Sequence, residues 1–231
     1  QAFLREQIAP GTRGVIADYM FCYPAFEGAP DGVGTAILMH DLFHARAGGD
    51  QDSVVAVTHE EEVAMLAKAQ SVFAIQQAER EFVEREVPGV EPILVPMPAY
   101  PVAEAQPGHG ATLLMVGSNT APNIEGLRDF LANAWPKVRD AMPSARLQVA
   151  GSMGHAFLGE SWPGVEFLGL VEDLDALYQE AGIVISPLTF GSGLKIKLVE
   201  GMAKGKAMVV SSVTLQGVEE LCEPGVVRAD S

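Results

Sequence analysis

The sequence has little positive charge and almost no cysteine. Its 231 residues include 15 Lys and Arg against 30 Asp and Glu, which gives a formal net charge of −15 at pH 7. This balance argues against nucleic acid as a partner and against a polybasic membrane patch, because both interactions need clustered cations. The two cysteines, Cys22 and Cys222, lie far apart, so we expect neither a disulfide framework nor a zinc site, and a reducing compartment fits.

Long apolar runs are also absent. No stretch approaches the ~18 to 20 apolar residues that span a bilayer, and the opening residues QAFLREQIAP lack the basic start and apolar core of a signal peptide. We therefore expect no integral membrane segment and a cytoplasmic location, either free or peripheral at the inner membrane face. The hydrophobic content of 48% is enough for a sizeable core, in one large domain or two modest ones.

The most informative stretch runs from 182 to 205, GIVISPLTFGSGLKIKLVEGMAKG. Its apolar residues 183–185 predict a buried parallel strand. Gly191 and Gly193 then form a tight loop, and an amphipathic helix is predicted from Leu194. A strand that passes through a glycine loop into a helix leaves backbone N–H groups unpaired at the helix start, and the helix dipole adds to their positive potential. This arrangement suits a phosphate group.

Charged side chains follow this glycine loop. Lys195 and Lys197 fall in the predicted first turn, where positive charge is mildly unfavourable for the helix and therefore indicates an anion nearby. Glu200 lies close to two turns beyond Gly193, on the same side of the helix, where a carboxylate can accept two hydrogen bonds from a ribose diol. An ordinary βα turn with solvated lysines is the alternative. The combination favours a site for a nucleotide diphosphate.

Short apolar runs and helical patterns alternate along the whole chain. Predicted strands lie at 15–17, 36–39, 71–75, 93–95, 112–116, 146–150, 165–168, 183–185 and 208–210. One predicted helix follows a capping box at Thr58 and Glu61, and the next is marked by the apolar residues at 78, 82 and 83 and stops at Pro88 and Gly89. Another spans 127–138 with a kink or restart at Pro136, and a fourth follows Asp173 as N-cap. Such βα repeats predict parallel sheets with helices on both faces and ligands at the carboxyl ends of strands.

Residues 97–110, MPAYPVAEAQPGHG, interrupt this alternation. They contain three prolines, two glycines and little periodicity, which is typical of an interdomain linker. We therefore place one Rossmann-like domain at 1–98, a linker at 99–110 and a second Rossmann-like domain at 111–231.

Four blocks of the second half resemble the C-terminal domain of retaining GT-B glycosyltransferases, the group often called family 4 or glycosyl transferases group 1. The blocks are MVGSNTAPNIEGLRDFL, ARLQVAG, VEFLGLVEDLDALYQEAGIVISPL and FGSGLKIKLVEGMAKGKAMVVSS. Their order and spacing agree over residues 113–210, roughly half of the chain. The resemblance implies an α/β fold of GT-B type, in which two Rossmann-like domains with parallel sheets face each other across a cleft. It also implies transfer of a sugar from a nucleotide-sugar donor with retention at the anomeric carbon.

The same resemblance implies a nucleotide-sugar site in the second domain, with the acceptor side in the first. The implied site consists of Gly117, Asn119, Gly191, Ser192, Gly193, Leu194, Lys195, Lys197 and Glu200, without a metal. Glu200 would hold the donor ribose, the segment 191–195 would surround the diphosphate, and the Gly117 loop would face the donor.

Three departures from the family pattern matter. Many members carry a glutamate where Ser192 stands, and an Arg and a Lys that bind diphosphate are not evident after Gly117. We expect Lys195 or Lys197 to take over part of that role. Both domains also look incomplete, because a glycine-rich first βα turn and the closing helices are not evident in the sequence.

The first half offers weaker candidates. The segment AILMHDLFHARAGG resembles the acceptor-side strand end of GT-B enzymes, so His40, Asp41 and Arg46 are catalytic candidates. A strand-end turn with a surface arginine explains the same residues equally well. His44 is placed to share a helical face with His40, but without a third ligand we expect no metal.

The remaining histidines and the acidic run are expected to lie at the surface. His59 falls in the capping turn of an acidic helix, His109 in the linker and His155 in the loop after 150. The run Glu60-Glu61-Glu62 predicts compensation of the helix dipole and a solvated face.

From these observations we predict a hexosyl-type glycosyltransferase that uses a nucleotide-sugar donor and a sugar, glycan or lipid-linked acceptor, with no cofactor. The helix start near Gly193 and its lysines would stabilise charge growing on the leaving diphosphate without a metal. Two alternatives stay open: a nucleotide-sugar epimerase of the same fold and a non-catalytic nucleotide-binding module.

Overall fold

The computed structural model describes residues 6, 8–45, 56–219, 222 and 225–230. The described chain forms two compact units. The first contains the described residues up to Pro98 together with Ser192–Leu194, and the second contains Ala99–Gly191 and the described residues from Lys195 onward. Each unit has its own sheet, and every paired strand is parallel to its neighbour, so the predicted α/β fold with parallel sheets is confirmed.

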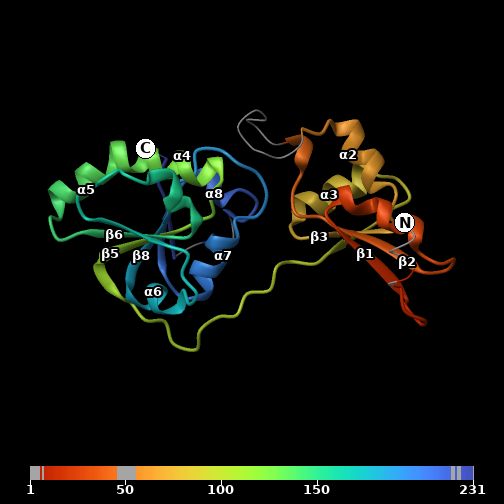
Figure 1. The fold of residues 1–231 in the computed structure, drawn as a ribbon, viewed down its shortest axis with the longest axis horizontal. Helices are drawn as coiled ribbons and strands as arrows, with labels where there is room; N and C mark the ends of the chain where they lie inside the picture. The colour runs from red at the N-terminus through yellow and green to blue at the C-terminus, as the bar shows by residue number, and fades with distance from the viewer. Residues whose placement is uncertain (1–5, 7, 46–55, 220–221, 223–224, 231) are drawn as a thin grey trace. The chain divides into compact units, whose positions relative to one another are not determined.

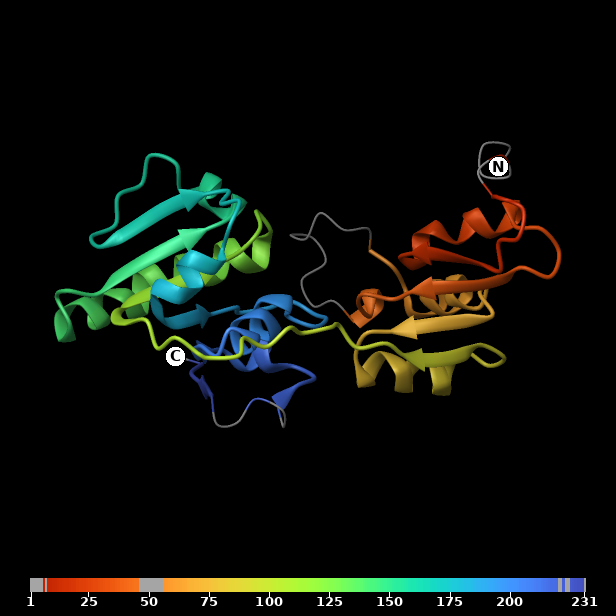
Figure 2. The same ribbon diagram turned by 90° about the horizontal axis from the view of Figure 1, so that it is seen from below.

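The sheet of the first unit has four strands in sequence order (Figure 2). The strands are β1 (Gly14–Asp18), β2 (Gly34–Leu38), β3 (Ser71–Ala74) and β4 (Glu91–Leu94). The helical segments are η1 (Met20–Gly28), η2 (Phe43–Ala45), α2 (His59–Leu66) and α3 (Gln77–Glu86). Because the strands are parallel, their carboxyl ends gather at one edge of the sheet.

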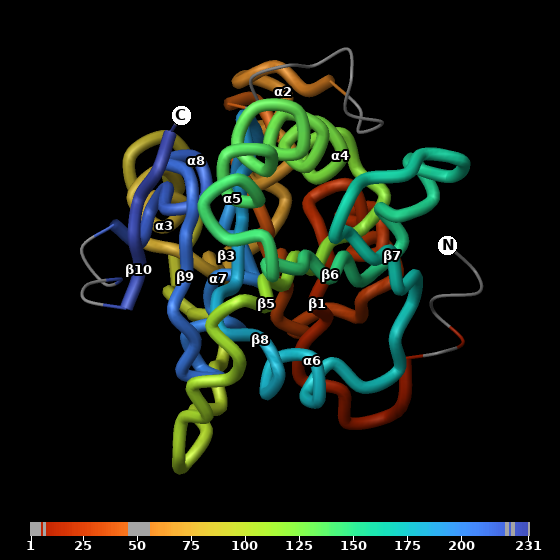
Figure 3. Tube along the Cα trace, turned by 90° about the vertical axis from the view of Figure 1, so that its left-hand side faces the viewer, coloured from red at the N-terminus to blue at the C-terminus, as the bar shows by residue number. Residues whose placement is uncertain are grey.

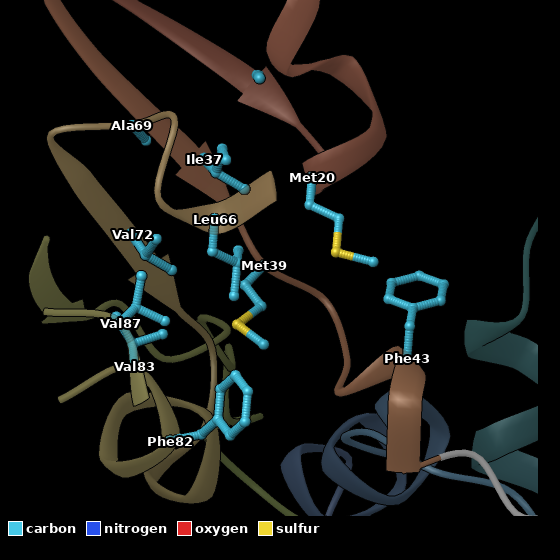
Figure 4. Close-up of a cluster of buried hydrophobic side chains, with 11 residues drawn as sticks. Met20, Ile37, Met39, Phe43, Leu66, Ala69, Val72, Phe82, Val83 and Val87 are labelled. Carbon is cyan, nitrogen blue, oxygen red and sulfur yellow. The ribbon is translucent and has the colours of Figure 1, made fainter. Parts of the chain in front are cut away.

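A continuous apolar core joins the strands and helices of this unit. Ile37, Leu66 and Val72 have no exposed surface, and Figure 4 shows the Met39 side chain next to Leu66 and Phe82. The apolar runs of the sequence are thus buried between elements of the unit. This burial explains why they form strands of the sheet and not surface loops.

Helix α2 begins with the predicted capping box. The Glu61 N–H donates to Thr58 Oγ1 at 3.2 Å, and the Thr58 N–H donates to Glu61 Oε2 at 2.9 Å. Glu60, Glu61 and Glu62 all lie in the first turn, where their negative charge compensates the helix dipole.

The prediction of a solvated acidic face is wrong for Glu62, which has no exposed surface. Its carboxylate accepts hydrogen bonds from the N–H groups of Phe43 at 3.1 Å and His44 at 2.8 Å, and its Oε2 lies 2.6 Å from His44 Nδ1. A buried carboxylate needs such partners, since an unpaired one would lose its hydration without compensation. Glu62 therefore fastens η2 to α2.

The sheet of the second unit has six strands in the order β10-β9-β8-β5-β6-β7 (Figure 3). The strands are β5 (His109–Val116), β6 (Arg146–Ala150), β7 (Val165–Gly169), β8 (Ala181–Ser186), β9 (Ala207–Val210) and β10 (Val226–Arg228). The helical segments are α4 (Ala121–Asp129), η3 (Phe130–Ala134), α5 (Trp135–Ala141), η4 (Ser152–Phe157), α6 (Asp175–Glu180), α7 (Ile196–Ala203) and α8 (Ser212–Leu215). Helices α4 and α5 cover one face of this sheet, and α6 and α7 cover the other (Figure 1).

Most predicted elements are present, and the differences have local causes. The predicted helix over 127–138 is divided by the π-helical segment η3, after which Pro136 lies in the first turn of α5. The restart follows because proline has no N–H for the helical ladder. His109 begins β5 instead of lying in the linker. The N-cap of α6 is Leu174, although Asp173 Oδ1 accepts from the Asp175 N–H at 2.8 Å.

The segment before β5 is bound to the second unit. The Val102 N–H donates to the carbonyl of Ala203 at 2.9 Å. The Lys206 ammonium, on a residue only 5% exposed, donates to the carbonyl oxygens of Gln106 and Ala181. Burial lowers the pKa of Lys206, and the carbonyl oxygens take the place of its hydration shell.

Replacement of Glu62 by Gln should lower the free energy of unfolding by about 1.5 to 3 kcal/mol, the range for hydrogen bonds to a charged group. The reason is that a neutral amide cannot match three charge-assisted contacts with η2. Glu60→Gln is the matched control, because Glu60 lies in the same turn but is exposed. Urea titrations that give the two variants equal stability would contradict the anchoring role of Glu62.

Candidate functional site

Strands β5 and β8 lie side by side in the second sheet, and their connections leave in opposite directions. The chain passes from β5 to β6 on one side and from β8 to β9 on the other. In an open parallel sheet, such a switch point leaves a crevice at the carboxyl ends where ligands bind. The loops at this position carry the sequence-predicted residues around Gly117 and Gly191.

The structure brings these two loops together. A Cβ atom built at Gly191 would lie 3.6 Å from Cγ of Pro122, which follows the Gly117 loop. Gly117 itself is closely packed, because a Cβ there would lie 2.9 Å from Met153 Sδ. A Cβ at Gly151, where φ is +105°, would collide with the carbonyl oxygen of Gly117. At Gly151, glycine is therefore required by direct packing of backbone on backbone, whereas the contacts at Gly117 and Gly191 are with side chains.

The β5–α4 loop is held in place by hydrogen bonds to η4 and to the start of α4. The Asn119 N–H donates to Ser152 Oγ at 2.9 Å, and Asn123 Nδ2 donates to the carbonyl of Ser118 at 3.1 Å and to Thr120 Oγ1 at 3.0 Å. The loop is therefore a fixed polar surface without a cationic side chain of its own.

The β8–α7 loop contains two glycines in conformations that other residues rarely adopt. The φ angles are +126° at Gly191 and +72° at Gly193. Helix α7 begins at Ile196, so the predicted start at Leu194 is two residues early and Lys195 is the N-cap. An N-cap residue has extended geometry, and Lys195 has φ −83° and ψ 92°. Lys197 does lie in the first turn.

Glu200 is half-buried on α7 and faces α6. Its Oε2 accepts from Lys197 Nζ at 2.8 Å and from the hydroxyl of Tyr178 at 3.5 Å. Burial and the neighbouring Glu200 carboxylate raise the pKa of the Tyr178 phenol, which therefore stays a hydrogen-bond donor. Tyr178 is a partner of Glu200 that sequence reasoning misses, because it continues the apolar face of its helix.

The carboxyl ends of β1 and β2 bring His40 to a partner that the sequence does not predict. His40 Nε2 lies 2.6 Å from Asp18 Oδ1, and the ring of Tyr19 lies 4.3 Å from the imidazole at an interplanar angle of 31°. The His40 side chain is 31% exposed, so it reaches the surface at this edge.

Asp41 is almost completely buried, unlike His40. Its Oδ1 accepts from the Leu42 N–H at 2.8 Å, and its Oδ2 accepts from Ser192 Oγ at 2.6 Å within the first unit. The structure therefore brings Asp41 and Ser192 together. Arg46, the third catalytic candidate, lies outside the described residues.

His44 and His40 do not share a helical face, so that expectation is wrong. The short helix η2 begins at Phe43, after His40, and His44 turns toward Glu62 and stacks on Phe82 with 5.0 Å between ring centroids. Within the described ranges, no group of three or more His, Cys, Asp or Glu is arranged to hold a metal ion.

The remaining surface histidines differ in their exposure. The His59 side chain is 43% exposed and lies 3.8 Å from Glu86, so it is only partly solvated. His155 is exposed on η4.

Glu79, in the first turn of α3, is a further buried carboxylate that the sequence pattern does not single out. It accepts from the Ile75 N–H and from Gln76 Nε2, each at 2.9 Å. Burial raises the pKa of Glu79, while these hydrogen bonds act in the opposite direction. Its exposure of 0% makes it part of the support of the strand ends rather than a surface group.

Comparison with known proteins identifies relatives of the second unit. A family model described as glycosyl transferases group 1 matches residues 110–229. An uncharacterized 44.6 kDa protein in the cps region of Klebsiella pneumoniae is 27% identical over 120 residues, which cover 47% of this chain and 31% of that protein. None of the helices that the structure describes is long and apolar enough to cross a membrane.

Solved structures share the fold over nearly the whole chain. TarM matches with a TM-score of 0.73 and 12% identity over 98% of this chain, and the pneumococcal O-GlcNAc transferase GtfA matches with 0.71 and 14% over 100%. Sucrose-phosphate synthase from Thermosynechococcus elongatus matches with 0.72 and 18% over 98%. The chain spans 47%, 48% and 63% of the length of these three proteins.

If Glu200 binds a ribose diol, as the sequence predicts, Glu200→Gln should weaken binding of a nucleoside diphosphate by about 1.5 to 3 kcal/mol, the range for a hydrogen bond to a charged acceptor. The amide has the same shape but cannot accept two hydrogen bonds from a ribose diol with equal strength. Calorimetry with the preferred nucleoside diphosphate measures this, with exposed Glu180→Gln on α6 as the control. Unaltered affinity in Glu200→Gln would remove Glu200 from the site.

Proposed function

The chain belongs to the glycosyl transferases group 1 family, and from this premise we propose that it transfers a sugar, of hexose type, from a nucleotide-sugar donor to a sugar, glycan or lipid-linked acceptor with retention of anomeric configuration. The observation that carries the proposal is the meeting of two glycine loops at the switch point between β5 and β8. Glu200 lies on the helix that follows the second loop. The family match spans all of these elements.

The structural neighbours support the choice of donor class. GtfA is described in complex with UDP and GlcNAc, and another neighbour, from Burkholderia xenovorans, is described as a UDP-forming trehalose-phosphate synthase. These proteins are 14% and 15% identical to this chain, so the likeness concerns the fold. We take from it a nucleoside diphosphate as the released product.

Sugar transfer from such a donor builds negative charge on the leaving diphosphate. In our proposal, the first-turn N–H groups of α7 and the ammonium of Lys195 stabilise that charge, since preorganised donors act strongly where water is excluded. Lys197 is bound to Glu200, so we assign it to the ribose side of the site. Metal is not required in this scheme, and no resident cofactor takes part.

The proposal assigns the donor to the second unit and the acceptor to the first. In the GT-B arrangement of family 4, two Rossmann-like domains form the active-site cleft. His40 at the end of β2 is the candidate group for contact with the reacting sugars, because its side chain reaches the surface. Asp41 is buried and bonded to Ser192, so we assign it a supporting role.

Product analysis with radiolabelled nucleotide sugars tests the proposal. The protein should release nucleoside diphosphate and form a glycoside only when an acceptor mixture of sugars, glycans or lipid-linked sugars is present. Conversion of the donor sugar without acceptor would identify an epimerase instead. A thermal-shift panel detects donor binding with or without turnover, since a ligand of the folded state raises apparent stability. Donor binding without any turnover would identify a non-catalytic module.

Lys195→Ala should weaken the binding of a nucleoside diphosphate at least tenfold more than the binding of the bare nucleoside, because a charge-assisted contact with phosphate is lost. Lys204→Ala is the matched control, since Lys204 caps the opposite end of α7 and pairs with Asp175 at 2.5 Å. Equal losses for nucleoside and diphosphate would show that Lys195 does not sense phosphate.

Treatment with EDTA should leave the rate of transfer unchanged, because backbone N–H groups and Lys195 supply the charge stabilisation in our scheme. The rate is measured before and after dialysis against chelator, and then with added Mg²⁺ or Mn²⁺. Loss of activity that only the divalent cation restores would refute metal independence.

A further inference from the structure

Tyr19 has an unusual backbone conformation at the end of β1. With φ 68° and ψ 147°, it is the one non-glycine residue of positive φ in the described part of the chain. Side chains disfavour this region, so the conformation persists only where the surroundings determine it, often at a functional site. A conventional negative φ would carry the ring away from its present neighbours.

The strained conformation sets the Tyr19 ring against His40. The Tyr19 N–H donates to the carbonyl of Leu38 at 3.1 Å, which fixes the backbone across the ends of β1 and β2. Its ring stacks on His40 at 4.3 Å and meets Phe43 edge-on at 6.1 Å. Phe43 is in turn held through its N–H by buried Glu62. A series of contacts therefore runs from Glu62 through Phe43 and Tyr19 to the His40 imidazole.

Asp18 constrains the same imidazole through a hydrogen bond. His40 Nε2 and Asp18 Oδ1 are 2.6 Å apart, and the Asp18 side chain is 71% exposed. A carboxylate accepts only, so a neutral His40 carries its proton on Nε2 and leaves Nδ1 as the acceptor nitrogen. An exposed pair such as Asp18 and His40 adds little to stability. Stability alone therefore does not account for the strained backbone of Tyr19 beside this pair.

We propose that Asp18 and Tyr19 are positioning residues that hold His40 in one tautomer and one orientation, so that Nδ1 accepts a hydrogen bond from a hydroxyl of the reacting sugar. The nature of this ligand rests on the proposed function. The arrangement of Asp18, Tyr19 and His40 rests on the distances and the backbone conformation alone.

Nitrogen-15 NMR of the imidazole tests the arrangement without any assay. At alkaline pH, His40 should be the Nε2-protonated tautomer, with its resonances assigned by their loss in His40→Asn. Asp18→Asn should give a mixture of the two His40 tautomers, because an amide can also donate to Nε2. Exposed Asp31→Asn is the matched control and should leave the His40 resonances unchanged. An unaltered tautomer in Asp18→Asn would overturn the role of Asp18.

Kinetics test the consequence for transfer. Asp18→Asn should lower kcat at least tenfold while the affinity for nucleoside diphosphate and the melting temperature stay unchanged. In the His40→Ala background, Asp18→Asn should cause no further loss, because both variants remove one interaction. Equal losses in the two backgrounds would overturn the proposal.

Two substitutions at Tyr19 distinguish the effect of its ring from the effect of its backbone conformation. Tyr19→Phe keeps the stack and should retain kcat, whereas Tyr19→Gly accepts the positive φ but lacks the ring and should lose kcat as Asp18→Asn does. Full activity in Tyr19→Gly would overturn the role of the ring. An unmutated protein that transfers no sugar would overturn the proposed function and the sugar hydroxyl as ligand, while the NMR result would still decide the arrangement itself.

Discussion

The opposite departure of the connections from β5 and β8 is the constraint on which the candidate donor site depends. Two adjacent parallel strands end at the same edge, but their chains separate there, so the loops of both remain uncovered by a connecting helix. The two loops approach each other where a Cβ built at Gly191 would lie 3.6 Å from Cγ of Pro122. Site geometry in this unit therefore follows from strand order first and from side chains second.

Local patterns were sufficient to predict much of this unit from the sequence. The apolar run 183–185, the pair Gly191 and Gly193, and the spacing to Glu200 indicated strand, loop and helix without knowledge of the sheet. The predicted start of α7 is two residues early, because Gly193 adopts φ +72° and the chain has an extended N-cap at Lys195 before the helix. Propensity alone does not contain that requirement.

Contacts between distant segments could not be predicted from local patterns. Glu62 lies in an acidic run that is typical of a solvated helix face, yet the N–H groups of η2 meet it in the core. The pairing of Asp18 with His40 depends on the register of β1 and β2, and a tyrosine with positive φ leaves no sequence signal. All of these features lie in the first unit, where the sequence has fewer motifs.

The packing of Gly117 against Gly151 limits how this site can change over evolution or in the laboratory. A side chain at Gly151 meets a backbone oxygen of Gly117, so no reduction in the size of a neighbouring side chain can make room for it. Compensating pairs of substitutions, which repair most tight contacts, do not exist for such a position. Any change in the surface of this loop must therefore arise at other residues, such as Asn119, while Gly151 stays glycine.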